Sequence, residues 1–199
     1  MSFRKLLRHE SILAVLLVLA LVASSNLSDR FLTIDNLLNQ GRMMTEAGII
    51  AVAMTFIIVS GGIDLSVGSI LGLSAIVLGM AWKDLGLPLP LAMLFAVAVG
   101  CVCGAINGII IIKSKMPPMI ATLGTLALYR GLAEGISQAR SVRGYPEWFY
   151  VLGQGELAGI PTQLWILGLV AAAGAIVLGF TTFGRVTYAI GSNETAGRF

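Results

Sequence analysis

The sequence contains little charge and few side chains that could carry out chemistry. Charged residues make up 12% of the 199 residues, whereas ordinary soluble domains contain about 25%. His9 is the sole histidine, and Cys101 and Cys103 are the two cysteines. On a helix these cysteines point to nearly opposite sides, so they cannot form a disulfide with each other. The sequence therefore predicts no metal site, no nucleophile–base pair and no cofactor.

The sequence also lacks the phosphate-binding loop G-x-x-x-x-G-K-[ST]. ATP hydrolysis is therefore not expected from this chain, and we predict that it is not an enzyme. Its net charge of +3 comes from basic residues scattered among loop ends. Such residues act as orientation signals in membrane proteins, so the charge does not require a nucleic-acid partner.

Hydrophobic residues, in contrast, make up 57% of the chain, and glycine accounts for 24 of the 199 residues. Apolar runs recur along the whole length, which predicts an all-α, polytopic transmembrane bundle forming one membrane domain over residues 1–199. The glycine content suits helices that pack closely in lipid. Six spans are expected, over residues 12–23 (extendable to 27), 47–60, 67–82, 89–112, 117–136 and 162–180.

The connections between these spans indicate the orientation. Residues 26–46 are expected to lie along the outer interface as a short amphipathic helix. Residues 138–160 form a longer outer loop, whose aromatic run 148–150 is expected to anchor at the interface. Both chain ends are placed in the cytoplasm by the positive charges of Arg4, Lys5, Arg8, Lys113 and Lys115.

The stretch Gly61-Gly62-Ile63-Asp64-Leu65-Ser66-Val67-Gly68 separates two apolar runs and places an acid between them. Two consecutive glycines favour a break in helical structure. Two roles remain open for Asp64. It or Ser66 caps the next helix by accepting a hydrogen bond from a free N–H group, or Asp64 is a functional carboxylate inside the bundle.

Small residues repeat every four positions in the fourth span, at Gly100, Gly104 and Gly108. This pattern predicts tight packing against a neighbouring helix, with the lining of a pathway as the alternative. Asn107, which lies beside the repeat, is expected to form a hydrogen bond across helices.

The segment after residue 180 breaks the apolar pattern. The chain is expected to leave the membrane at Gly184-Arg185. Residues 189–198 predict a turn followed by a short helix, with Ser192 or Asn193 as its N-cap.

Three ordered blocks carry a resemblance to a known family. Residues 61–68 resemble the signature of the ribose-type permeases of bacterial ABC importers. Ala121-Thr122-Leu123-Gly124-Thr125 with Tyr129-Arg130-Gly131 is similar to a second block of that family. Phe183-Gly184-Arg185 followed by Ala189-x-Gly191-x-Asn193-x-x-Ala196-Gly197-Arg198 is similar to its cytoplasmic coupling segment. The blocks run from Gly61 nearly to the end of the chain.

The resemblance implies the permease subunit of a small-sugar importer in the bacterial inner membrane. Such subunits pair with a second permease subunit, two cytoplasmic ATPases and an extracytoplasmic sugar-binding protein. The resemblance makes Gly61, Gly62, Asp64, Ser66, Gly68, Thr122, Gly124 and Arg130 transport or structural positions, and Gly191, Asn193, Ala196 and Arg198 ATPase-coupling positions. Family members usually have alanine where this chain has Gly197. Because the family pattern continues with Ser-Gly-Ile and further spans, the chain is expected to be an N-terminal portion of a permease.

Arg130 and Glu134 are four positions apart, so a mutual ion pair is expected, with contact to the binding protein or the sugar as the alternative. Two other functions are open for the chain as a whole. One is a secondary transporter or channel that uses Asp64 as its ion or proton site. The other is a membrane scaffold without transport activity.

Overall fold

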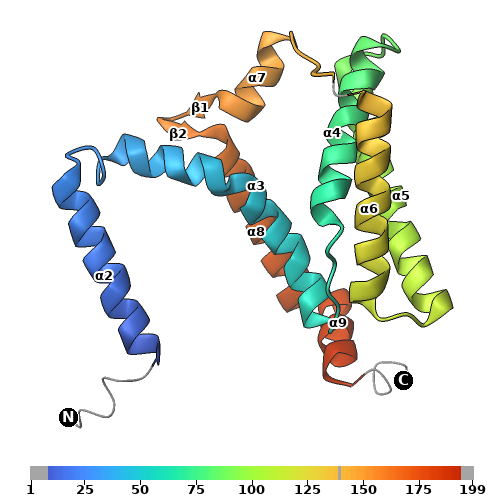
Figure 1. Cartoon of the computed structure of the whole chain (residues 1–199), viewed down its shortest axis with the longest axis horizontal. Coiled ribbons are helices and arrows are strands. Elements are labelled where there is room, and N and C mark those ends of the chain that lie inside the picture. The colour runs from blue at the N-terminus through green and yellow to red at the C-terminus, as the bar shows by residue number, and fades with distance from the viewer. Residues whose placement is uncertain (1–8, 139, 194–199) are drawn as a thin grey trace.

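The computed structural model describes residues 9–138 and 140–193 of the chain. These residues form helices joined by short turns, with one two-stranded antiparallel hairpin (Figure 1). The elements are α2 (His9–Leu27), α3 (Ile34–Val59), α4 (Val67–Lys83), α5 (Leu89–Ser114), α6 (Pro118–Ser137), α7 (Glu147–Gln154), β1 (Glu156–Leu157), β2 (Ile160–Pro161), α8 (Thr162–Phe180) and α9 (Thr182–Ser192).

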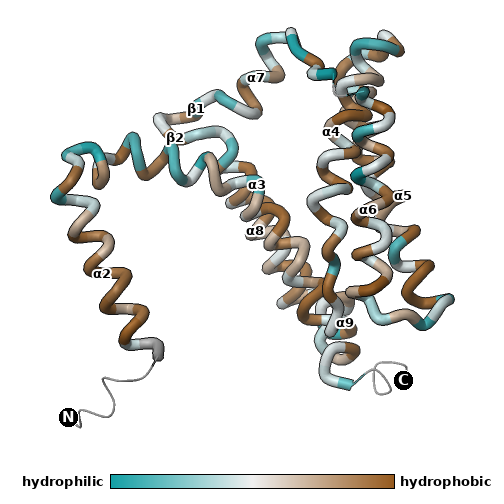
Figure 2. The backbone as a smooth tube through the Cα atoms, viewed as in Figure 1, coloured by the Kyte–Doolittle hydropathy of each residue, from teal (hydrophilic) through white to brown (hydrophobic). Residues whose placement is uncertain are grey.

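The expected helical membrane architecture is confirmed in its general form. Among the described residues, α3, α5 and α8 are long and apolar enough to cross a membrane, and α2 and α4 contain shorter apolar stretches. Figure 2 shows the hydrophobic character of α2 and the lower half of α3, and the more polar connections at the helix ends. The number of spans stays a prediction.

Prolines and glycines determine most of the helix boundaries. Pro88, Pro117 and Pro161 directly precede α5, α6 and α8, where proline's missing N–H group is tolerated. Four helices, α4, α5, α6 and α8, accordingly begin and end close to the predicted spans.

The predicted break at residue 47, between a connection at 26–46 and a span at 47–60, is wrong, because α3 runs continuously from Ile34 to Val59. The Thr33 side chain caps this helix by accepting from the Asn36 N–H at 3.4 Å. The helix bends along its length (Figure 1). Thr45 donates to the Gly41 carbonyl at 3.0 Å, and such bonding to the preceding turn often bends helices.

The helices pack in two groups (Figure 1). The first consists of α4, α5 and α6, and the second of α3, α8 and α9. Gly41 and Gly48 allow α3 to approach α8, since a Cβ atom at either position would lie 3.0–3.2 Å from Leu164 or Leu167. The two groups are connected by residues 60–66 at one end and by residues after α6 at the other.

The last described helix differs from the prediction. Thr181 caps α9, its side chain accepting from the Gly184 N–H at 3.2 Å, and the helix continues through Gly184-Arg185 to Ser192. Ser192 is therefore the last residue of a helix and Asn193 its C-cap, so the prediction that either is an N-cap is wrong. Ala196 and Arg198 lie outside the described residues.

Candidate functional site

The two consecutive glycines end α3 by a specific backbone motif. Gly61 adopts a φ of +84°, its N–H donates to the Ile58 carbonyl at 2.9 Å, and the Gly62 N–H donates to the Ile57 carbonyl at 2.8 Å. This pair of bonds is a Schellman motif, in which the residue after the helix takes a left-handed conformation. Glycine adopts that conformation without steric cost.

We therefore expect Gly61→Ala to destabilise the chain by about 1–2 kcal/mol, the cost of a left-handed conformation for a residue with a Cβ atom. Gly68→Ala is the matched control. Gly68 lies in the first turn of α4, and a Cβ atom there has no described atom within 4 Å. Unfolding in detergent measures both variants, and equal stabilities would contradict the proposed role of Gly61.

After this motif, Asp64 folds the chain back on itself before α4. Asp64 Oδ1 accepts from the Ser66 N–H and from the Ser66 hydroxyl, both at 2.7 Å. The backbone bond spans two residues, which is the geometry of an Asx turn. Among the described residues, the Ser66 hydroxyl makes no capping bond to α4. Asp64 thus holds the residue that precedes the helix, rather than an N–H group within its first turn.

A chain of buried hydrogen bonds extends from this turn into the neighbouring helices. Ser66, Asn107 and Tyr129 are at most 4% exposed. Asn107 Nδ2 donates to Ser66 Oγ at 2.8 Å, and the Tyr129 hydroxyl lies 3.1 Å from Asn107 Oδ1 and 3.0 Å from the Cys103 carbonyl. Because Ser66 Oγ accepts from the amide, its own hydrogen is available for Asp64. Donation therefore runs from Asn107 through Ser66 to the carboxylate, and the single Tyr129 proton lies between the Cys103 carbonyl and Asn107 Oδ1.

Thr122 fixes the same turn from α6. Its hydroxyl accepts from the Leu65 N–H at 3.2 Å and donates to the Pro118 carbonyl at 2.9 Å. Thr122 is 1% exposed, so the Leu65 N–H has a satisfied partner away from solvent. The turn is thereby held by side chains from both α5 and α6.

The polar cluster lies inside the helix group and not at its end. Asn107 precedes Lys113 by six residues, which corresponds to about 9 Å along a helix axis. Asp64 itself is half-buried, and Oδ1 accepts both bonds from Ser66. The Asp64 carboxylate is therefore fixed through Oδ1, and no described residue donates a hydrogen bond to its other oxygen.

Three further residues that the family resemblance marks lie around a groove between α4 and α6 or face outward, namely Gly68, Gly124 and Arg130. The groove has a volume of about 400 Å³, and its walls include Gly68, Ser69, Gly72, Arg130 and Glu134. Arg130 Nε pairs with Glu134 Oε1 at 3.0 Å, and both side chains are about 70% exposed. The expected ion pair is thus present. Gly124 is exposed, and a Cβ atom there has no described atom within 4 Å.

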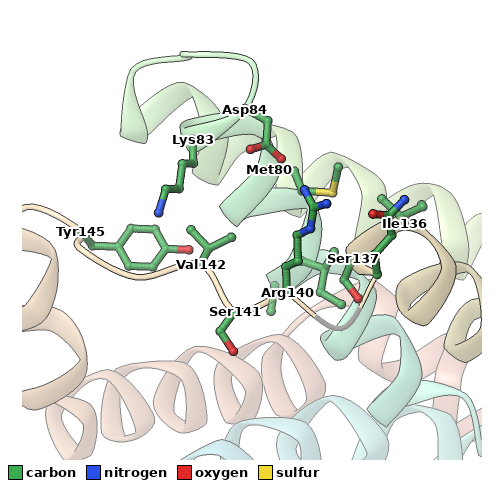
Figure 3. A pocket seen from close by; sticks show the side chains of 12 residues that line it. Met80, Lys83, Asp84, Ile136, Ser137, Arg140, Ser141, Val142 and Tyr145 are labelled. Atoms are coloured by element: carbon green, nitrogen blue, oxygen red, sulfur yellow. The ribbon is translucent and has the colours of Figure 1, made fainter.

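A larger cavity of about 740 Å³ lies where the connection after α6 crosses the end of α4 (Figure 3). Figure 3 shows Lys83, Asp84, Arg140 and Tyr145 around it. The Tyr145 ring stacks on Trp82 with a centroid distance of 4.6 Å. Burial, and to a lesser extent the neighbouring Tyr150, raises the pKa of Tyr145. The sequence predicts a long outer loop with an interfacial aromatic run here, but it does not indicate this cavity.

The three glycines of α5 are not equivalent. A Cβ atom at Gly100 would lie 3.3 Å from Ser74 Oγ on α4, whereas one at Gly104 or Gly108 has no described atom within 4 Å. Gly100 therefore makes the close helix contact within this chain. No described helix packs closely against Gly104 or Gly108, so the predicted packing of these two glycines stays a prediction.

The sequence indicates the members of the polar cluster separately but not their connection. It predicts that Asn107 bonds across helices, and it marks Tyr129 only within a family block. Asn107 is a polar position in an apolar helix, whereas Tyr129 is one of several polar positions on α6. Within the described residues no group of three or more His, Cys, Asp or Glu side chains could hold a metal.

Comparison with known proteins gives consistent matches. Residues 35–199 match the family described as "Branched-chain amino acid transport system / permease component". The chain is 37% identical to a ribose import permease protein of Haemophilus influenzae over 97% of its length, and 38% identical to the Escherichia coli K12 protein of that name. It is 36% identical over 92% of its length to an autoinducer 2 import system permease protein of E. coli.

The chain spans about 60% of the length of these relatives, namely 60% of both ribose permeases and 57% of the autoinducer 2 permease. No solved structure matches.

Proposed function

The chain belongs to the family described as the permease component of the branched-chain amino acid transport system, and we propose that it forms part of the membrane subunit of a bacterial ATP-driven importer for a small sugar. The observation that carries this proposal is its identity of 36–38% to ribose and autoinducer 2 import permeases. The expected partners are cytoplasmic ATPases, an extracytoplasmic sugar-binding protein and a second permease subunit.

We further propose that the protein lies in the bacterial inner membrane and crosses it six times. The proposed spans are α2, α3, α4, α5, α6 and α8, and both chain ends are in the cytoplasm. The arrangement of the helices supports this topology. In Figure 1, α9 and the α5–α6 turn lie at one end of the helices, whereas α7 and the hairpin lie at the other. The first end carries Lys113 and Lys115, as the positive-inside rule requires.

Uptake measurements test the proposed function. Vesicles containing the permease, its ATPase and a sugar-loaded binding protein should accumulate labelled ribose when ATP is supplied, and collapse of the proton gradient should not prevent it. Uptake that follows the proton gradient and ignores ATP would instead identify a secondary transporter. Absence of uptake for pentoses, deoxyhexoses and autoinducer 2 alike would contradict a small-sugar permease.

The groove between α4 and α6 is our candidate for part of the sugar path. Its volume of about 400 Å³ accommodates a monosaccharide, and its Ser69, Arg130 and Glu134 side chains offer donors and acceptors for sugar hydroxyls. Gly68 and Gly72 contribute no side chain to the groove, so they leave its α4 wall open. The groove also borders Leu65, whose N–H is fixed by Thr122.

Filling the groove should therefore inhibit uptake without unfolding the protein. A Cβ atom at Gly72 has no described atom within 4 Å, so Gly72→Leu should keep the thermal stability while lowering sugar uptake about tenfold or more. Gly168→Leu on α8 is the control, because Gly168 is equally uncrowded and lies outside the groove. Equal uptake by the two variants would exclude the groove from the path.

The ATPase-coupling assignment is also proposed, for Gly191, Asn193, Ala196 and Arg198. Its support is the family likeness of this segment and the position of α9 beside the α5–α6 turn end of the molecule (Figure 1). We propose that Asp64 holds the turn before α4, because Oδ1 accepts both of its bonds from Ser66 at 2.7 Å.

A further inference from the structure

The end of α9 touches the backbone at the end of α3. A Cβ atom at Gly191 would overlap the Val59 carbonyl oxygen and would lie 3.3 Å from the Ser60 Cα atom. A Cβ atom at Gly61 would lie 3.9 Å from the Gly191 Cα atom. Gly191 on α9 therefore lies directly against the backbone of Val59 and Ser60, which precede the turn that carries Asp64.

Other contacts hold α9 to the same side of the turn. Phe183 lies against Phe56 of α3, with the ring centroids 6.2 Å apart. Thr187 is buried, and its hydroxyl donates to the Phe183 carbonyl at 2.8 Å. Since α9 also packs on α8, it is held to the group that contains the end of α3.

The downstream side of the turn is held by the other helix group. The Leu65 N–H is bonded to Thr122 of α6, and Ser66 Oγ to Asn107 of α5. Residues 61–64 are therefore the short link between the two packed groups at this end of the molecule. Near α9, a displacement of α9 relative to α5 and α6 is taken up in this link, because closely packed interiors transmit strain instead of absorbing it.

We infer that the close backbone approach of Gly191 to Val59 and Ser60, just before the Asp64 turn, transmits a displacement of α9 to that turn, which makes Gly191 a positioning residue for coupling ATP hydrolysis to sugar transport. This inference rests on the proposed function. It assigns to Gly191 a mechanical role inside the membrane subunit, separate from any direct contact of the coupling segment with the ATPase.

Gly191→Ala in the complete transporter tests this role. The methyl group must push α9 away from Val59, so we expect the amount of sugar imported per ATP hydrolysed to fall about fivefold or more. ATPase recovery with the permease is measured in parallel, because Gly191 also belongs to the proposed ATPase-coupling segment. Gly179→Ala on α8, where a Cβ atom has no described atom within 4 Å, is the matched control and should couple normally. Normal coupling by Gly191→Ala would overturn the inference, and absence of ATP-dependent uptake in the unmodified transporter would overturn both it and the proposed function.

A distance measurement covers the case in which Gly191→Ala fails to assemble. Spin labels are placed at the exposed positions Tyr188 on α9 and Leu71 on α4, in a protein with Cys101→Ala and Cys103→Ala and with Gly191 retained. We expect the distance between the labels to change when ATP binds, together with a change between Leu71 and a label on the exposed Phe180 of α8. A movement confined to α9, with α4 unmoved relative to α8, would overturn the inference.

Discussion

Replacing Ser66 with alanine is expected to lower the free energy of unfolding by about 2 kcal/mol, because it leaves the Asn107 Nδ2 donor unpaired in a buried site. Asp64 Oδ1 also loses one of its two bonds. Ser69→Ala is the matched control. The Ser69 hydroxyl donates only to the Ser66 carbonyl, which already accepts from the Ile70 N–H, so its loss should cost a few tenths of a kcal/mol.

A double-mutant cycle identifies the origin of the loss. Ser66→Ala and Asn107→Leu are measured singly and together by unfolding in detergent. If the two side chains interact as the 2.8 Å bond indicates, the combined loss should be smaller than the sum of the single losses by about 0.5–2 kcal/mol. Strict additivity would show that each side chain acts alone and that no continuous polar chain links the three helices.

Replacing Asp64 with leucine is expected to reduce sugar uptake at least tenfold, whereas Asp64→Asn should retain it within about threefold. An asparagine oxygen accepts the same two bonds from Ser66, and a leucine side chain accepts none. Uptake by the assembled transporter measures the difference. Assembly is checked separately, by co-purification of the ATPase with each variant.

The asparagine variant also separates the two roles of Asp64 that the sequence leaves open. It keeps the shape and the acceptor of the side chain but removes its charge. If Asp64→Asn assembles with the ATPase and still imports no sugar, the charge itself is required, and the carboxylate takes part in transport instead of only holding the turn.

Local signals in the sequence predict the helix boundaries but not the contacts between distant helices. Gly61-Gly62 and the prolines before α5, α6 and α8 interrupt the backbone wherever they occur, so they can be interpreted without knowing the fold. The continuity of α3 depends instead on Gly41 and Gly48 packing against Leu164 and Leu167. These partners lie more than 100 residues further along the chain, and nothing near residue 47 indicates them.

The same limitation applies to the polar cluster and to α9. Asn107 is recognisable as a polar residue in an apolar helix, but its bonds to Ser66 and Tyr129 depend on how α4, α5 and α6 pack. The region around Ser192 offers a good capping residue in the sequence. However, Thr181 starts the helix earlier, and Gly191 lets it reach the end of α3 without a clash.

The pairing of α3 with α8 has a consequence for biosynthesis. The glycine face of α3 is complete when Val59 has been made, but α8 ends at Phe180, about 120 residues later. At roughly 5–20 residues per second, the ribosome needs on the order of 6–24 s to make that segment. During this interval α4, α5 and α6 can assemble among themselves, while α3 has only lipid or the insertion machinery against its glycines. Among the packed helix pairs that the structure describes, those of α3 with α8 and α9 are therefore separated by the longest intervals of synthesis.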